Sequence, residues 1–114
     1  MESHLVTIDV AHPPRPADAV EAALVEAWSQ VRNSDTLRIL KIIHGHGSSG
    51  RGGSTREVVR SWLFRRREKF KGVIQGEQYG LFDASTREMW SAVGNYHDTD
   101  LDRGNAGITV VWVR

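Results

Sequence analysis

The sequence predicts an α/β fold: a two-layer sandwich in which helices pack on a four-stranded mixed sheet, in the order β-α-β-α-β-β. Three observations predict it. The length of 114 residues suits one domain, residues 1–114, whose single core begins at about residue 5. Apolar runs typical of strands alternate with apolar residues at helical spacing. Strands separated by helices favour parallel pairing with right-handed crossovers, and the last strand is expected to run antiparallel to a neighbour.

The first half of the chain is predicted to contain two strands joined by a helix. Residues 5–10 read as a strand that ends at the proline-rich segment 13–16. From Ala17 onward, apolar residues recur at helical spacing, and Pro16 suits the first turn of such a helix. Residues 37–43 form a nearly continuous apolar run, which is typical of a strand covered on both faces.

A second helix is predicted to begin near Ser54, with Ser54 or Thr55 as its cap. Its apolar stripe is expected to run from Val58 through Trp62 to Phe70. Four basic residues follow one another at spacings that place them on roughly one side of this helix: Arg56, Arg60, Arg67 and Lys71. That side is a candidate surface for a polyanion, although charge runs on helices are usually solvated surfaces.

The rest of the chain is predicted to add two strands. An extended stretch begins at Val73, and residues 108–113 carry the most regular strand pattern, after a turn at residues 104–107. Between them, residues 83–103 are acidic and polar, with a short helix predicted around residues 87–92. We expect this segment to be a variable insertion that suits a partner contact better than a phosphate contact.

The net charge of +1 conceals an uneven distribution of charge along the chain. Residues 36–72 hold ten Lys or Arg and two Glu, a balance of +8, whereas residues 1–35 and 73–103 each have a balance of −4. Such segregation indicates a basic face. We therefore expect a nucleic acid, DNA or RNA, as the partner.

The composition excludes several kinds of site. The chain has no cysteine, so disulfides, thiolate metal sites and cysteine nucleophiles are excluded. Histidine and aspartate occur without metal-ligand spacing, and we expect neither a metal nor another cofactor. No apolar run approaches the roughly 18 residues that span a bilayer, and the first residues lack a signal-peptide pattern. We therefore expect a cytoplasmic protein without membrane contact.

The segment 39–56 carries the strongest functional pattern of the chain. A buried-type strand runs into a loop with five glycines, two histidines and an arginine, and the loop opens onto the basic helix. Glycines let backbone N–H groups approach a ligand closely, and a helix N-terminus adds partial positive charge. Together they predict a phosphate site. Its candidate residues are Gly45, Gly47, Arg51, Gly52, Gly53, Arg56 and Arg60.

Proton-transfer residues are expected to converge on the same edge of the sheet. In sheets of this type the ligand lies beyond the C-terminal ends of the parallel strands, which places residues 10–12 beside residues 44–47. The candidate catalytic residues are Asp9, His12, His44 and His46. Phosphodiester cleavage needs proton transfers that histidine suits at neutral pH, and an anionic transition state that arginines and amides stabilise. Two alternatives stay open: Asp9 can bond loop amides, and His44 can hydrogen-bond structural backbone.

Together these patterns resemble the Smr (small MutS-related) domain family over residues 6–114. The family's opening Leu-Asp-Leu-His-Gly motif resembles Ile8-Asp9-Val10, which an alanine-rich helix follows. Its H/T-G-x-G loop resembles His44-Gly45-His46-Gly47, with Gly52-Gly53 beyond it. Its Gly-Gly-x-Gly-[Val/Ile]-Thr-Val-Val ending is similar to residues 104–111.

The resemblance implies a two-layer α/β sandwich like the C-terminal domain of a bacterial translation initiation factor. It also implies nucleic-acid binding, because members of the family bind nucleic acid. Several act as endonucleases that nick DNA or cleave RNA, including messenger RNA on stalled ribosomes. The matching positions are Asp9 for the motif aspartate and His44, Gly45 and Gly47 for the loop.

One position departs from the family's pattern. The motif histidine, two residues after the aspartate, falls on Ala11, and His12 stands one residue later. Adjacent strand residues point to opposite faces, so His12 can substitute only where a bulge or turn re-aims it. Two hypotheses follow: a nucleic-acid-binding Smr domain with endonuclease activity through Asp9 and a histidine, or a non-catalytic nucleic-acid- or ribosome-binding module. A third is a binder of small phosphate esters or nucleotides. The sequence predicts no oligomeric state.

Overall fold

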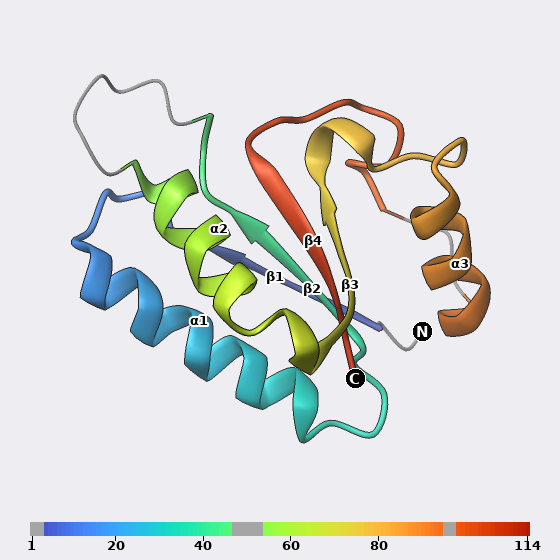
Figure 1. Ribbon diagram of the computed structural model, residues 1–114, viewed down its shortest axis with the longest axis horizontal. Helices are drawn as coiled ribbons and strands as arrows, with labels where there is room; N and C mark the ends of the chain where they lie inside the picture. The colour runs from blue at the N-terminus through green and yellow to red at the C-terminus, as the bar shows by residue number, and fades with distance from the viewer. Residues whose placement is uncertain (1–3, 47–53, 95–97) are drawn as a thin grey trace.

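A computed structural model describes residues 4–46, 54–94 and 98–114. Within these residues the sheet has four strands in the order β1-β2-β4-β3. They are β1 (Leu5–Asp9), β2 (Ile39–Ile43), β3 (Phe70–Gln75) and β4 (Ile108–Val113). β1 pairs with β2 in parallel, and β4 runs antiparallel to both β2 and β3. The predicted α/β fold, with a mixed sheet and an antiparallel last strand, is therefore confirmed (Figure 1).

Two helices, α1 (Ala17–Arg32) and α2 (Thr55–Arg65), cover one face of the sheet (Figure 1). Of the two predicted caps of α2, Ser54 is the observed one, because its side chain accepts a hydrogen bond from the Glu57 N–H. Both helices bury their apolar stripes against alternate residues of the strands. The buried residues of this core include Val20, Leu24, Val31, Leu40, Ile42, Val59, Trp62 and Val111.

A third helix, α3 (Ala84–Val93), packs on the opposite face, so part of the sheet is covered on both sides (Figure 1). It is longer than the helix predicted at residues 87–92. The Asp83 side chain caps it by accepting a hydrogen bond from the Thr86 N–H, and Gly94 ends it at a φ of 86°. The core beneath α3 contains Ile39, Ile74, Tyr79, Met89, Trp90, Ile108 and Val110.

The predicted extension of the second helix to Phe70 is wrong. The helix ends at Arg65, a 3-10 turn occupies Arg67–Lys69, and Phe70 begins β3. The residues of this turn are good helix formers, so local propensity favours a longer helix. Pairing of Phe70 with Val113 of β4 overrides that propensity. The four basic residues predicted on one helix side are consequently divided, two in α2 and two beyond its end.

The C-terminal ends of β1, β2 and β3 meet the N-terminal end of β4 at one edge of the sheet, which we call the rim. Asp9 pairs with Ile43, and Ile43 pairs with Ile108. One residue further along, the Val10 N–H donates a hydrogen bond to the Ile43 carbonyl at 2.9 Å. The predicted placement of the chain after β1 beside His44 is therefore confirmed.

Across residues 4–46, 54–94 and 98–114, no helix combines the length and the apolar content needed to cross a membrane.

Candidate functional site

Asp9 and His12 form a carboxylate–imidazole pair where β1 ends at the rim. The Asp9 Oδ2 lies 3.0 Å from the His12 Nδ1. The Asp9 Oδ1 accepts hydrogen bonds from the N–H groups of Ala11 and His12 at 2.9 and 3.0 Å. The chain turns around the carboxylate, and this turn brings the His12 ring beside it. The His12 side chain is 73% exposed, so the pair lies at the surface.

The Asp9 carboxylate determines which nitrogen of His12 faces solvent. Burial by itself raises the pKa of Asp9, but hydrogen bonds from the Ala11 N–H and from the side chain and N–H of His12 outweigh it and hold the pKa below its ordinary value. Asp9 is therefore ionised at neutral pH and accepts a hydrogen bond from the His12 Nδ1. That tautomer leaves the lone pair on Nε2, where His12 can accept a proton.

His44 is engaged on both ring nitrogens. Its side chain is buried, with 2% of the residue exposed. Nδ1 donates to the Gly45 carbonyl at 2.7 Å, and Nε2 lies 2.8 Å from the Thr109 hydroxyl, which itself lies 2.9 Å from the Gln75 Oε1. Burial lowers the pKa of His44 and keeps the ring neutral. These contacts support the structural alternative for His44 over proton transfer to a ligand.

Gly45 holds the start of the loop against β4. The N–H groups of His44 and Gly45 both donate to the Gly107 carbonyl, at 2.9 and 3.0 Å. The Gly45 N–H is therefore committed to the fold and is not directed at a phosphate. Glycine suits this position because its φ is +78°, a conformation that other residues rarely adopt. A Cβ built on Gly45 would lie in ordinary contact with the Ala11 Cβ, at 3.8 Å. Position 11, where the Smr family has its motif histidine, thus faces the loop glycine.

Arg56 and Arg60 converge on a carboxylate that the sequence did not predict, Glu77. The Glu77 Oε2 lies 3.0 Å from the Arg56 Nη2 and 3.6 Å from the Arg60 Nη2. Arg56 also donates to the His46 carbonyl at 3.1 Å and so fixes the chain where the loop begins. A hydrogen bond to its own backbone, together with the two arginines, lowers the pKa of Glu77 despite partial burial. Glu77 is therefore ionised and neutralises about half of this positive charge.

The remaining candidates are divided between the rim and residues outside the described ranges. His46 is exposed at the rim, and the position of a Cβ on Gly107 would lie 3.4 Å from its Nε2. Arg15 adds a cation that the sequence did not single out, because its Nη2 donates to the Asp9 carbonyl at 3.5 Å. The other predicted phosphate-binding residues lie outside the described residues: Gly47, Arg51, Gly52 and Gly53.

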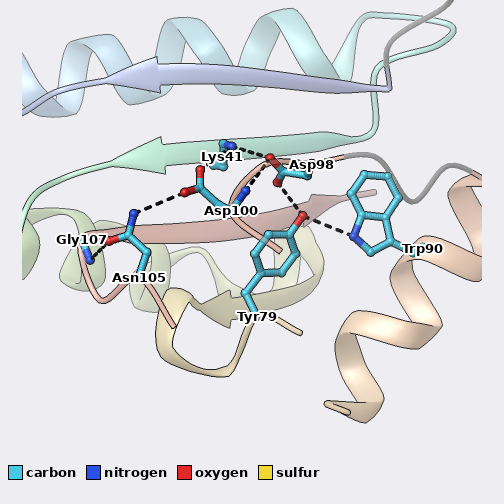
Figure 2. Close-up of polar contacts among 7 residues, drawn as sticks. All are labelled: Lys41, Tyr79, Trp90, Asp98, Asp100, Asn105 and Gly107. Atoms are coloured by element: carbon cyan, nitrogen blue, oxygen red, sulfur yellow. Dashed lines mark hydrogen bonds and ion pairs between the residues drawn. The ribbon is translucent and has the colours of Figure 1, made fainter. Parts of the chain in front are cut away.

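A second polar cluster lies on the opposite face of the sheet, beneath α3 (Figure 2). Lys41 Nζ contacts the Asp98 and Asp100 carboxylates at 2.6 and 2.7 Å, and the Tyr79 hydroxyl donates to Asp98 at 2.6 Å. Trp90 Nε1 donates to the Tyr79 hydroxyl at 3.2 Å. We call these five residues the buried cluster. It binds the segment after α3 to the middle of β2.

The charge states of the buried cluster are mutually stabilised. Burial by itself lowers the pKa of Lys41, but its hydrogen bonds to Asp100 and Asp98 outweigh burial and raise the pKa above its ordinary value. The same hydrogen bond from Lys41 lowers the pKa of Asp100. Burial and the bond to Asp98 raise the pKa of Tyr79. At neutral pH the cluster therefore holds an ammonium group, an Asp100 carboxylate and a neutral phenol.

The buried cluster connects to the rim through the turn that precedes β4. The Asn105 Nδ2 donates to Asp100 at 3.4 Å, and the Asn105 Oδ1 accepts from the Gly107 N–H at 2.9 Å (Figure 2). The Gly107 carbonyl in turn accepts hydrogen bonds from the N–H groups of His44 and Gly45. The segment predicted to offer its acidic residues to a partner thus directs Asp98 and Asp100 into the protein.

The described residues contain no group of three or more His, Cys, Asp or Glu side chains that could hold a metal ion. Comparison of the chain with models of known protein families, with curated proteins and with solved structures finds no match.

Proposed function

We propose that this protein is a nucleic-acid-binding domain of the Smr type that cleaves phosphodiester bonds at the rim, with His12 as the proton-transfer residue. The observation that carries the proposal is the Asp9–His12 pair, in which an ionised carboxylate holds an exposed imidazole at 3.0 Å. A carboxylate that orients a histidine is a recurring arrangement in proton-transfer sites. The turn after Asp9 presents His12 at the surface although the motif position itself is occupied by Ala11.

RNA is the substrate that this pair suits best. In RNA the 2′-hydroxyl next to the scissile phosphate is an internal nucleophile, so one correctly placed base can begin the reaction. His12 Nε2 removes the 2′ proton as the 2′ oxygen bonds to phosphorus, and the P–O5′ bond breaks. The departing 5′ oxygen takes up a proton from water, and His12 returns its proton to solvent. The products are a 2′,3′-cyclic phosphate and a 5′-hydroxyl.

The cations of the rim supply electrostatic support for an anionic substrate. Arg15 lies beside Asp9, and Arg56 lies at the start of α2, where it donates to the His46 carbonyl. Arg60 lies one turn further along α2 and contacts Glu77. Arginine suits this role because its planar group donates several hydrogen bonds to phosphate oxygens. The two α2 arginines share Glu77, so their net attraction for a polyanion is smaller than the sequence predicts.

A second candidate is a non-catalytic nucleic-acid- or ribosome-binding module. It is favoured by the two amide hydrogen bonds at Asp9 Oδ1, which give the carboxylate a role in the turn without any chemistry. Under this candidate the rim binds a phosphate backbone, and the loss of the motif histidine at position 11 removes cleavage.

The test compares the parent protein with His12→Gln and Asp9→Asn on end-labelled single-stranded RNA and on supercoiled plasmid, with and without EDTA. We expect RNA cleavage to fall by about 10²- to 10⁴-fold in His12→Gln, because a general base contributes about that much. Asp9→Asn should also lose activity, because the carboxylate no longer fixes the tautomer. His4→Gln is the matched control, since His4 bonds the Thr36 carbonyl at the other end of β1.

Cleavage that survives in His12→Gln would contradict the assigned role of His12. A salt-sensitive mobility shift without cleavage by the parent protein would support the non-catalytic module instead.

A further inference from the structure

A groove of about 470 Å³ runs between α2 and β3 on the helix-covered face of the sheet. β3 is an edge strand, so the groove lies at the side of the molecule. The residues that line it include the apolar Leu63, Phe64 and Val73 and the basic Arg60 and Arg67. The volume is within the range of about 300–1,000 Å³ typical of pockets for small ligands.

Phe64 stands out among the lining residues because it is an aromatic side chain left in solvent. It is 65% exposed, although the two residues before it in α2, Trp62 and Leu63, are buried. Arg67 holds the ring in place, because its guanidinium carbon lies 4.2 Å from the ring centroid and its Nη1 donates to the Phe64 carbonyl at 2.8 Å. One side of the ring is thus covered by a cation, and much of the rest is open to a ligand.

The charge of the groove indicates what kind of ligand fits it. Its lining contains two arginines and no acidic side chain. The Arg60 Nη2 lies 3.6 Å from the Glu77 Oε2, which Arg56 also contacts. Arg67 has no ion pair with any carboxylate of the described residues. An exposed aromatic ring between two arginines fits a chain that alternates flat bases with phosphates.

We propose that this groove binds single-stranded nucleic acid, with a base stacked on Phe64 and the neighbouring phosphates held by Arg60 and Arg67. The groove reaches the rim, because Gln75 lines it and also contacts Thr109, the partner of His44. The inference therefore rests on the proposed function and deepens it: the strand that enters the rim is unpaired on its way along β3. A duplex would hide the base faces that Phe64 needs.

Fluorescence anisotropy with a labelled oligouridylate of about 12 nucleotides, within the usual site sizes for single strands, tests the proposal. The strand carries 2′-O-methyl groups, so its 2′ oxygens cannot act as nucleophiles. We expect Phe64→Ala to weaken binding by about 5- to 150-fold, the range that stacking on one aromatic side chain supplies. Phe64→Trp should keep parental affinity, and Arg67→Gln should lower the salt slope by about 0.7. Phe82→Ala is the matched control, because Phe82 is 98% exposed but lies outside the groove.

Two further nucleic acids distinguish the contribution of base stacking to affinity from the contribution of charge. An abasic strand of the same length should bind the parent protein and Phe64→Ala equally, and a duplex should bind the parent protein more weakly than the single strand. Equal affinity of Phe64→Ala and the parent protein for oligouridylate would overturn the groove proposal while leaving the proposed function intact. So would an equal loss in Phe82→Ala. If the parent protein binds none of these nucleic acids, the proposed function itself fails, and a peptide paired with the free edge of β3 becomes the better occupant.

Discussion

The rim and the face of the sheet beneath α3 both carry ion pairs, but these pairs differ in their exposure to solvent. At the rim, Arg56 and Arg60 share Glu77, and these side chains are 23%, 36% and 44% exposed. Beneath α3, Lys41 contacts Asp98 and Asp100, and the side chains of Lys41 and Asp98 are only 6% and 5% exposed. Asp100 is 25% exposed, so the cluster meets solvent on that side alone, whereas two of the three side chains at the rim are more exposed than this. Each site joins residues far apart in the sequence.

The difference in exposure suits the rim to ligand binding and the buried cluster to a structural role. Exposed ion pairs contribute about 0–1 kcal/mol to stability, so their partners can exchange for a ligand at little cost. A buried charge cannot lose its partner in this way, because it has no water to replace it. The buried cluster therefore holds the segment after α3 in place, and the rim remains available for an anion.

Removing the ammonium group of Lys41 should produce the largest effect. Lys41→Met leaves Asp98 buried without its cation, and we expect the free energy of unfolding to fall by about 3–5 kcal/mol. Urea denaturation followed by tryptophan fluorescence measures it. Arg65→Gln is the control, because Arg65 pairs with Glu21 at 2.8 Å on the surface and should cost no more than about 1 kcal/mol. Equal losses of unfolding free energy in the two variants would contradict the proposed difference between buried and exposed ion pairs.

The fold was largely predictable because its strands and first helix carry regular patterns. The strand at residues 108–113 and the helix from Ala17 are observed where the sequence predicts them. Local patterns were least informative where tertiary contacts decide the structure. Phe70 continues a helical apolar spacing, yet its pairing with β4 places it in a strand.

The candidate site was predictable in its location but only partly in its contacts. Parallel strand ends placed Asp9 and His44 on one rim, and the topology confirms this placement. Glu77 could not be predicted, because its contact with Arg56 joins residues that are far apart in the chain. The ion pairs of Lys41 could not be predicted for another reason. A single lysine in an apolar run is compatible with an ordinary strand residue, and its partners come from an irregular segment.

A change of pH should have a smaller effect on the free energy of unfolding, which we expect to fall at both acid and alkaline pH. The pKa of Asp100 is lowered from 3.8, so its contribution is present above that pH and is lost as pH falls through the folded-state value. The pKa of Lys41 is raised from 10.5, so its contribution is present below that pH and is lost as pH rises through the folded-state value. The raised pKa of Tyr79 adds to the loss of stability at alkaline pH, in the parent protein and in Lys41→Met alike.

Unfolding measured from acid to alkaline pH should therefore show the difference between the parent protein and Lys41→Met narrowing at both ends. A difference that stays constant across the whole range would show that the charges of the buried cluster do not stabilise the fold.

The smallest effect on stability, and the most informative about the rim, is expected from Glu77→Gln. The variant removes the carboxylate that Arg56 and Arg60 share, and the loss should be no more than about 1 kcal/mol because the pairs are exposed. It also leaves both arginines without a competing anion. We therefore expect tighter nucleic-acid binding and a salt slope steeper by up to about 0.7–0.9, the value of one additional phosphate contact.

Glu21→Gln is the matched control for Glu77→Gln, since Glu21 is a similarly exposed carboxylate that pairs with Arg65 away from the rim. Anisotropy titrations at several salt concentrations distinguish the two variants. A steeper slope in Glu77→Gln alone would locate the phosphate contacts at the start of α2, because both variants add the same net charge. Identical slopes in both would instead mean that the domain attracts nucleic acid through its overall charge, and that Glu77 does not limit what the rim can bind.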